Sequence, residues 1–279
     1  MRSGSGVYTD ILGLPESVFR ILRDLIHQRT GMFYDDSKRD MLAGKLAPHV
    51  LESGFASFLD YYYLLKYGPG EDAEWAHVLN LLSVPETFFW REIDQIQALV
   101  RVVVPRLIAQ GSAPVRIWSA ACASGEEPLT IAMALDEAGL LGSVAISASD
   151  ASTSAIEKAR AGLYRERSFR ALPPHLQARY FIRAGDAWRV DPELHRRISW
   201  HVANITCADE IAGLGAAPVV FCRNAFIYFG EPMVRKTVEL FWQAMPSPGY
   251  LFLGAAESLL RLSTRFELAE LERAFVYVK

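Results

Sequence analysis

The strongest constraint on the fold is an alternation of short apolar runs with helical segments from residue 115 onward. Four runs rich in β-forming residues stand between stretches of helical periodicity. They are VRIWSA (115–120), SVAISASD (143–150), APVVFCRN (217–224) and GYLFLGAAESL (249–259). Apolar strands that alternate with helices are typical of an α/β domain with a mostly parallel sheet. We therefore expect such a domain over residues 115–279.

The chain before residue 115 follows another pattern. Apolar residues recur at helical spacing over residues 15–83, and no convincing strand is present. The first helical stretch lies between Pro15 and Gly31, and the second has a candidate cap at Ser37 and a Pro48 that would kink or end it. The sequence predicts an all-α domain over 1–83, a linker with the first cofactor motif over 84–114, and a small β-insertion at about 180–203 within the α/β domain.

The composition limits the class of protein. The 279 residues are 51% hydrophobic, and no window approaches the length of apolar sequence that spans a membrane. The N-terminus lacks the apolar run of a signal peptide, so we expect a cytoplasmic protein without membrane insertion. A formal net charge of −3 argues against a nucleic-acid binder that relies on positive charge. Cys122, Cys207 and Cys222 are far apart and are expected to be reduced thiols.

Polar residues follow the apolar runs, at the strand ends where parallel α/β sheets bind ligands. They are Glu126, Glu127, Asp150, Asn204, Arg223 and Asn224. The turn after the first run has one glycine, Gly125, and two acids, whereas a phosphate cradle needs several glycines and no acid. An acid here suits a ligand with a cationic group. The alternative, that both acids only complement the helix macrodipole, stays open.

Asp150 ends the second apolar run, 25 residues after Gly125. An acid about 20 residues past a glycine turn holds the ribose in dinucleotide-binding folds, although Asp150 could instead cap the following helix. The two features together indicate an adenosine-containing ligand without phosphates. S-adenosylmethionine fits, because it carries a ribose, an ammonium and a sulfonium and no phosphate.

Four motifs occur in order along the chain. They are VPETFFWRE (84–92), RIWSAACASGEEPLTIAMAL (116–135), SASDASTSAIEKARAGLY (147–164), and VFCRNAFIYFGEPM (220–233) followed by PSPGYLFLGAAESL (246–259). Together they resemble the CheR family of chemotaxis receptor glutamate O-methyltransferases. The resemblance implies a class I (Rossmann-like) methyltransferase domain that transfers a methyl group from S-adenosylmethionine to glutamate, leaving S-adenosylhomocysteine. The helical N-terminal part resembles the family's receptor-contacting domain more loosely.

The resemblance also implies which residues bind the cofactor. They are Thr87, Arg91, Glu126, Asp150, Asn204, Ile205, Arg223 and Asn224. Among them, Glu126 would meet the methionyl ammonium and Asp150 the ribose. Asn204 and Ile205 match the pair that lies near the adenine in the family. Glu127 is expected to cap or brace the turn instead.

Arg91 and Tyr228 are the catalytic residues that the resemblance implies, near the transferred methyl group. Trp90 replaces the family's second aromatic residue. Pro85 stands where the family often has an asparagine, so a cofactor hydrogen bond from that side chain is missing. Simpler explanations stay open, since Thr87 could cap a helix that starts near Phe88 and Arg91 could be a solvated charge.

The implied substrate is the cytoplasmic helical domain of a chemoreceptor, which presents an acidic surface. Lys38, Arg39 and Lys45 are candidate contacts, with Lys38 and Lys45 on one helical face, although a solvated face is an open alternative. A glutamate carboxylate titrates near ~4.3, so it attacks without a general base or a metal. The short turn at Gly185 favours independence from a receptor C-terminal peptide. We expect a monomer that binds no nucleic acid.

Three other functions remain possible from the sequence. A methyltransferase of nucleic acids or small molecules is disfavoured, because the chain lacks the Asn-Pro-Pro-Tyr type of motif. A non-catalytic S-adenosylmethionine-binding regulator is disfavoured by the intact Arg91 and Tyr228. A methyltransferase of a chemosensory-like pathway that does not control motility cannot be told apart by residues, since a site does not encode its pathway.

Overall fold

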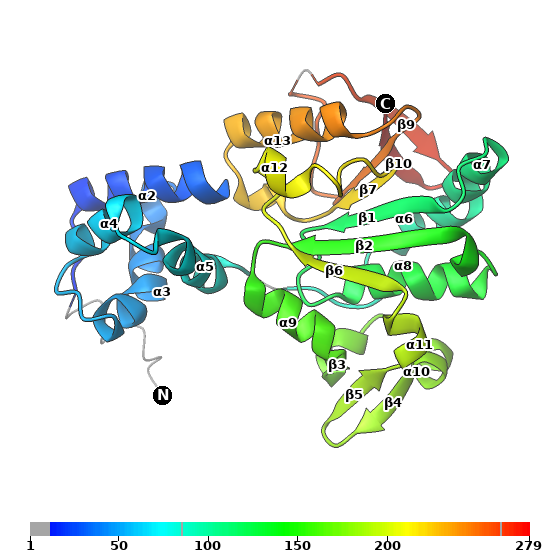
Figure 1. The fold of residues 1–279 in the computed structure, drawn as a ribbon, viewed down its shortest axis with the longest axis horizontal. Helices are drawn as coiled ribbons and strands as arrows, with labels where there is room; N and C mark the ends of the chain where they lie inside the picture. Colours follow the sequence, from blue (N-terminus) through cyan, green and yellow to red (C-terminus); the bar gives the residue numbers. More distant parts are fainter. Residues whose placement is uncertain (1–11, 85, 263) are drawn as a thin grey trace. The chain divides into compact units, whose positions relative to one another are not determined.

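The computed structural model describes residues 12–84, 86–262 and 264–279, except for the side chain of Glu71. It divides into two compact units (Figure 1). The first holds the chain up to Val84 together with Tyr228–Val234, and the second holds Pro85–Ile227 and Arg235–Lys279. In the part of the chain that the structure describes, no helix has the length and apolarity that crossing a membrane requires.

The first unit is helical, which confirms the expected all-α domain. Its elements are α2 (Glu16–Thr30), a 3₁₀ turn (Asp36–Lys38), α3 (Arg39–Glu52), α4 (Phe58–Tyr67) and α5 (Glu71–Leu82). Each helix buries one apolar stripe in a shared core. The fully buried side chains of that core include Leu22, Ile26, Leu42, Leu46, Val50 and Tyr61. Met32 also forms an isolated β-bridge with Phe229, which comes from the later segment of this unit.

The helix ends in this unit agree only partly with the sequence-based expectations. Pro15 precedes α2 and Gly31 ends it with a φ of +82°, as expected. Ser37 is not the cap of α3, because its own N–H is bound by the Asp35 carboxylate within the preceding 3₁₀ turn. Nor does Pro48 end α3, which continues to Glu52. The packing of the buried Leu46 and Val50 on either side of Pro48 offsets the hydrogen bond that proline removes.

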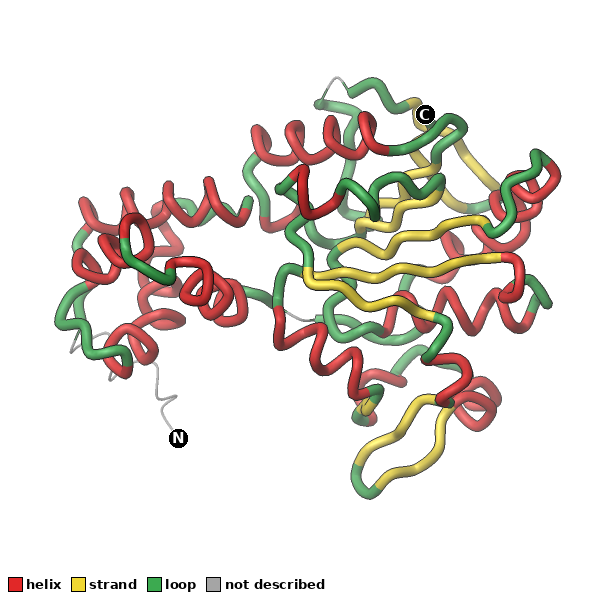
Figure 2. The backbone as a smooth tube through the Cα atoms, viewed as in Figure 1, coloured by secondary structure: helices red, strands yellow, loops and turns green. Residues whose placement is uncertain are grey.

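The second unit is built on a seven-stranded sheet of order β6-β2-β1-β7-β8-β10-β9 (Figure 2). The strands are β1 (Val115–Ala120), β2 (Val144–Asp150), β6 (Ile198–Val202), β7 (Val219–Cys222), β8 (Tyr250–Leu253), β9 (Glu267–Leu271) and β10 (Ala274–Val278). The first five strands of that order run parallel, and β10 is antiparallel to both of its neighbours. The alternation of apolar runs and helices therefore predicted the fold class correctly.

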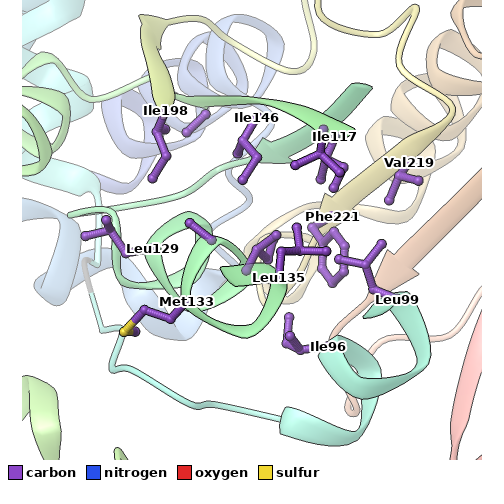
Figure 3. Packing of buried hydrophobic residues seen from close by; sticks show 14 of the residues in the cluster. Ile96, Leu99, Ile117, Leu129, Met133, Leu135, Ile146, Ile198, Val219 and Phe221 are labelled. Atoms are coloured by element: carbon purple, nitrogen blue, oxygen red, sulfur yellow. The ribbon is translucent and has the colours of Figure 1, made fainter. Parts of the chain in front are cut away.

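Helices cover both faces of the sheet. The α-helices after residue 92, with one π-helical turn, are α6 (Ile93–Ala98), the π-helical turn (Leu99–Val103), α7 (Val104–Ala109), α8 (Glu126–Glu137), α9 (Thr153–Ala161), α10 (Pro174–Tyr180), α11 (Pro192–His195), α12 (Ala208–Ile211) and α13 (Glu231–Ala244). Figure 3 shows Leu135 of α8 and Ile96 of α6 below Ile117 of β1. On the opposite face, the ring centroids of Trp118 in β1 and Phe241 in α13 lie 5.5 Å apart.

Two of the expected segments differ in the structure. Residues 84–114, expected as a linker with the first cofactor motif, are helical over Ile93–Ala109 and bury Ile96, Leu99 and Val103 in the core of the second unit. The β-insertion also has other bounds than the expected 180–203. Its sheet consists of β3 (Leu163–Tyr164), β5 (Ala187–Val190) and β4 (Phe181–Ala184), whereas β6 pairs in parallel with β2 in the main sheet.

Candidate active site

The site lies at the carboxyl ends of the parallel strands, and its first part is the turn between β1 and α8. Ala121, Ala123 and Gly125 all have positive φ values, of +59°, +48° and +94°. A Cβ at Gly125 would lie 2.8 Å from the ring of Trp200 in β6, so only glycine fits there. Glu126 follows this turn directly as the first residue of α8.

Glu126 is a buried carboxylate, with 3% of the residue exposed. Ser124 donates its hydroxyl to Oε2 at 2.7 Å, and Ser168 donates its hydroxyl to Oε1 at 2.9 Å. Burial raises the pKa of Glu126 above its ordinary value, while the charge of Arg167 partly opposes that rise. Among the described residues, no lysine or arginine lies within ion-pair distance of this carboxylate. A buried negative charge with hydroxyl partners and no ion-pair partner among the described residues fits a cationic ligand group.

Asp150 joins the turn after β1 to the start of α9. Its Oδ2 accepts the N–H of Ala123 and its Oδ1 the N–H of Ser152, both at 2.9 Å. Burial raises the pKa of Asp150. Asp150 is not the cap of α9, because the Ser152 hydroxyl accepts the N–H of Ala155 in that role. Each carboxylate oxygen of Asp150 keeps a second lone pair for ligand hydroxyls.

Asn204 and Ile205 follow β6 and lie beside Asp150. The N–H of Ala203 donates to the Asp150 carbonyl at 3.0 Å, which places the segment at the same sheet edge. The Asn204 Oδ1 accepts the N–H of Thr206 in a tight turn, and Ile205 is 5% exposed. Because β6 belongs to the main sheet, this pair lies beside Asp150, although the sequence suggested that β6 belonged to the insertion.

The segment 86–92 is anchored by an aromatic side chain. The Phe89 ring is fully buried and packs at centroid distances of 4.9–5.2 Å against Tyr164, Phe169 and Phe181. No helix begins at Phe88, since α6 starts only at Ile93, so Thr87 is not a helix cap. Thr87 itself is half-buried.

Arg91 extends from this anchored segment and is not simply solvated, since its side chain is only 27% exposed. Its Nη1 donates to the Glu86 carbonyl at 3.1 Å, and its guanidinium lies 5.6 Å from the Phe88 ring centroid. The residues on both sides, Trp90 and Glu92, have positive φ values of +68° and +51°. Non-glycine residues adopt this conformation when surrounding contacts hold them in it.

Arg223 follows β7 and is buried, with 3% of its side chain exposed. Its Nε donates to Glu127 Oε2 at 2.6 Å, and its Nη1 donates to the Arg91 carbonyl at 3.1 Å. Ser119 of β1 donates its hydroxyl to the other Glu127 oxygen. Arg223 is thus a brace between β7, α8 and the backbone of Arg91. The sequence indicated that an arginine at the end of an apolar strand needs a partner, but it could not show that Glu127 is that partner.

Asn224 and Tyr228 belong to the loop after β7 but fall in different compact units. Asn224 has a φ of +59°, and its N–H donates to the Glu257 carboxylate at 2.8 Å. Tyr228 is counted with the first unit, where its carbonyl accepts the N–H of Phe33 at 2.8 Å. Pro85, the expected departure from the family pattern, lies outside the described residues.

Comparison with known proteins decides the family. Residues 85–275 match the model of the CheR methyltransferase, SAM binding domain, and residues 17–83 match the CheR methyltransferase, all-alpha domain. Chemotaxis protein methyltransferase 2 of Vibrio cholerae is 33% identical over 95% of this chain and 94% of its own length. Chemotaxis protein methyltransferase of Escherichia coli is 34% identical over 93% of this chain and 91% of its own length.

The chain belongs to the CheR methyltransferase family. This membership makes it an S-adenosylmethionine-dependent methyltransferase of chemotaxis. Among solved structures, the rRNA methyltransferase aviRa of Streptomyces viridochromogenes matches 76% of this chain and 93% of its own with a TM-score of 0.41 and 17% identity. That likeness is too low to bear on the activity.

The basic residues of the CheR all-alpha domain are only partly available to a partner. Lys38 lies in the 3₁₀ turn before α3 and forms an ion pair with Asp35 at 3.5 Å, with 47% of its side chain exposed. Arg39 is 44% exposed. Lys45 donates to the Leu82 carbonyl at 2.9 Å, and burial lowers its pKa. Lys38 and Lys45 therefore do not form one exposed helical face.

Proposed function

We propose that this CheR protein transfers a methyl group from S-adenosylmethionine to glutamate side chains on the cytoplasmic helical domain of chemoreceptors. The products would be glutamate methyl esters and S-adenosylhomocysteine. The observation that carries the proposal is the buried Glu126 carboxylate, which has hydroxyl partners and no cation of the protein within ion-pair distance among the described residues. The ammonium of S-adenosylmethionine would provide the missing positive charge.

The remaining cofactor contacts follow from the residues at the sheet edge. Asp150 would accept hydrogen bonds from the ribose hydroxyls with its free lone pairs, as acids do after the second strand of dinucleotide-binding folds. Asn204 and Ile205 would border the adenine, Ile205 with an apolar surface. Thr87 and Arg91 would contact the methionyl part.

The transfer itself requires alignment more than proton movement. S-adenosylmethionine supplies an electrophilic methyl group on a sulfonium. A glutamate substrate is already ionised at neutral pH, because its pKa is near ~4.3, so no base has to act first. Arg91 and Tyr228 are the proposed catalytic residues. Arg91 would orient the incoming carboxylate, and orientation of bound reactants can lower a barrier by about 7–11 kcal/mol. Arg223 would act indirectly, since it holds the Arg91 carbonyl.

The receptor domain is the proposed partner, and the acidic surface of such a domain would meet Lys38 and Arg39, whose side chains are about half exposed. Lys45 is left out of this contact, because its ammonium is bound within the all-alpha domain. We propose further that the protein acts as a cytoplasmic monomer.

The direct test uses tritiated S-adenosylmethionine and a panel of receptor cytoplasmic fragments. We expect label on the receptor that alkali releases as volatile methanol, which identifies a methyl ester. Arg91→Ala should lose most of this activity and still bind S-adenosylhomocysteine in calorimetry. Cofactor binding without transfer to any fragment would instead favour a non-catalytic regulator. No cofactor binding at all would contradict the roles of Glu126 and Asp150.

A further inference from the structure

Glu257 is a buried carboxylate that the proposed chemistry does not use. It follows β8, and four backbone N–H groups donate to its two oxygens. Oε2 accepts the N–H of Asn224 at 2.8 Å and that of Gly254 at 2.7 Å. Oε1 accepts the N–H of Phe226 at 2.7 Å and that of Ile227 at 3.3 Å. Burial raises the pKa of Glu257, while these N–H groups partly oppose the rise.

Three of the four N–H groups belong to one loop, which connects Arg223 to Tyr228. The N–H groups of Phe226 and Ile227 open the 3₁₀ turn Phe226–Tyr228, where the first donors have no partner inside the turn. Because β7 and β8 are parallel neighbours, a side chain that follows β8 can reach the loop that follows β7. One carboxylate thus determines the course of the chain between two of the family's site residues.

The geometry requires a carboxylate at this position. An ionised carboxylate only accepts hydrogen bonds, whereas an amide would turn an NH₂ group toward two of the N–H donors. The same geometry requires a glycine at 254. A Cβ there would lie 2.9 Å from Glu257 Oε2 and 2.5 Å from Asn224 Nδ2.

We infer that Glu257 is a positioning residue, which holds the loop 224–227 in the conformation needed for methyl transfer. The inference rests on the methyltransferase activity of the family and not on the glutamate specificity proposed above. Glu257 should influence the rate of transfer more than cofactor affinity. Of the residues expected to bind the cofactor only Asn224 lies on this loop, whereas Glu126 and Asp150 lie on other segments, after β1 and at the end of β2.

The test compares Glu257→Gln and Gly254→Ala with two matched controls. Glu239→Gln removes an exposed carboxylate that pairs with Arg265, and Gly213→Ala adds a Cβ with nothing within 4 Å. We expect both loop variants to lower kcat about 100-fold, the loss that a displacement of about 1 Å can cause. Their Kd for S-adenosylhomocysteine should change less than about threefold, and the controls should match the wild type in both quantities.

Hydrogen exchange of the peptide 222–229 provides a readout that needs no methyl acceptor. Exchange should be faster in both loop variants than in the wild type and the controls. Unchanged exchange, or a folded Glu257→Gln protein with wild-type kcat, would overturn the inference, as would equal losses of kcat and cofactor affinity. If Glu257→Gln does not fold, the same measurements of kcat, cofactor affinity and hydrogen exchange on Gly254→Ala decide whether the inference holds. A wild-type protein that methylates no receptor would count against the proposed substrate, and the exchange result would still decide the role of Glu257.

Discussion

Glu126 combines a negative charge with nearly complete burial, and this combination affects stability and binding in opposite directions. Its charge has hydroxyl partners but no cation within ion-pair distance among the described residues, so the ligand-free protein bears the desolvation cost. A cationic ligand removes that cost. Function and stability should therefore change in opposite senses when the charge is removed.

Glu126→Gln tests this opposition. The variant should bind S-adenosylhomocysteine about 10- to 100-fold more weakly, since a hydrogen bond to a charged group is worth about 1.5–3 kcal/mol. Without ligand it should be about 0.5–2 kcal/mol more stable at pH 7, as is common when a functional site is neutralised. Calorimetry and urea unfolding measure the two effects. A variant that binds normally would show that Glu126 does not contact the ammonium.

The same carboxylates predict a pH dependence. Burial raises the pKa values of Glu126 and Asp150, so between the ordinary and the raised values the folded state binds more protons than the unfolded state. The free energy of unfolding should therefore fall as pH rises through that window. Affinity for S-adenosylhomocysteine should rise over the same window, because binding needs the ionised form. Glu126→Gln should reduce the pH dependence of both the free energy of unfolding and the affinity for S-adenosylhomocysteine. If both quantities changed with pH equally in the variant and the wild type, Glu126 would not be the group that titrates.

Arg223→Met tests the buried brace. The substitution leaves Glu127 as an unpaired buried charge, which should lower the free energy of unfolding by about 3–5 kcal/mol. Arg265→Met breaks the exposed ion pair with Glu239 and should cost less than about 1 kcal/mol. Urea unfolding at pH 7 compares the two. Similar losses in both variants would show that the Arg223 pair is not buried in solution.

At the scale of elements, the turn between β1 and α8 determines where Glu126 points. Gly125→Ala would place a Cβ 2.8 Å from the Trp200 ring at a φ of +94°. Gly139 has a φ of +69° but open space around a Cβ, so Gly139→Ala carries the backbone cost alone, about 1 kcal/mol. We expect Gly125→Ala to be less stable than Gly139→Ala and to weaken S-adenosylhomocysteine binding at least about tenfold. Equal behaviour of the two variants would refute a steric role for Trp200.

At the scale of the whole molecule, substitutions in the all-alpha unit should change receptor binding without changing cofactor affinity, which depends on the second unit. The charge reversal Lys38→Glu with Arg39→Glu should raise KM for the receptor fragment about tenfold at low salt, less at high salt, and leave cofactor affinity unchanged. Lys45→Met should instead lower stability by about 1 kcal/mol through the lost bond to the Leu82 carbonyl, without a KM effect. If Lys45→Met raised KM as much as the double charge reversal does, Lys45 would also contact the receptor fragment.

Features that depend on neighbours in sequence were predictable. The helical spacing of the first unit, the strands β1, β2, β7 and β8, and the position of Glu126 at the start of α8 all follow from periodicity and turn residues within short windows. The order of four motifs was enough to identify the family, which the family models confirm.

Pairings between distant residues could only come from the tertiary structure. The Glu127–Arg223 bond spans 96 positions, the Glu257 contact with the Asn224 N–H spans 33, and β6 joins β2 although the sequence placed it in the insertion. An arginine at the end of an apolar strand, such as Arg223, needs an acidic partner, but the sequence contains many acids that could be that partner. Which acid serves depends on how the strands are ordered in the sheet, and that order is set by long-range packing rather than by any local pattern. The sequence by itself therefore determined the fold class and the family and predicted which acids face the cofactor, and the tertiary structure decided which residues hold those acids in place.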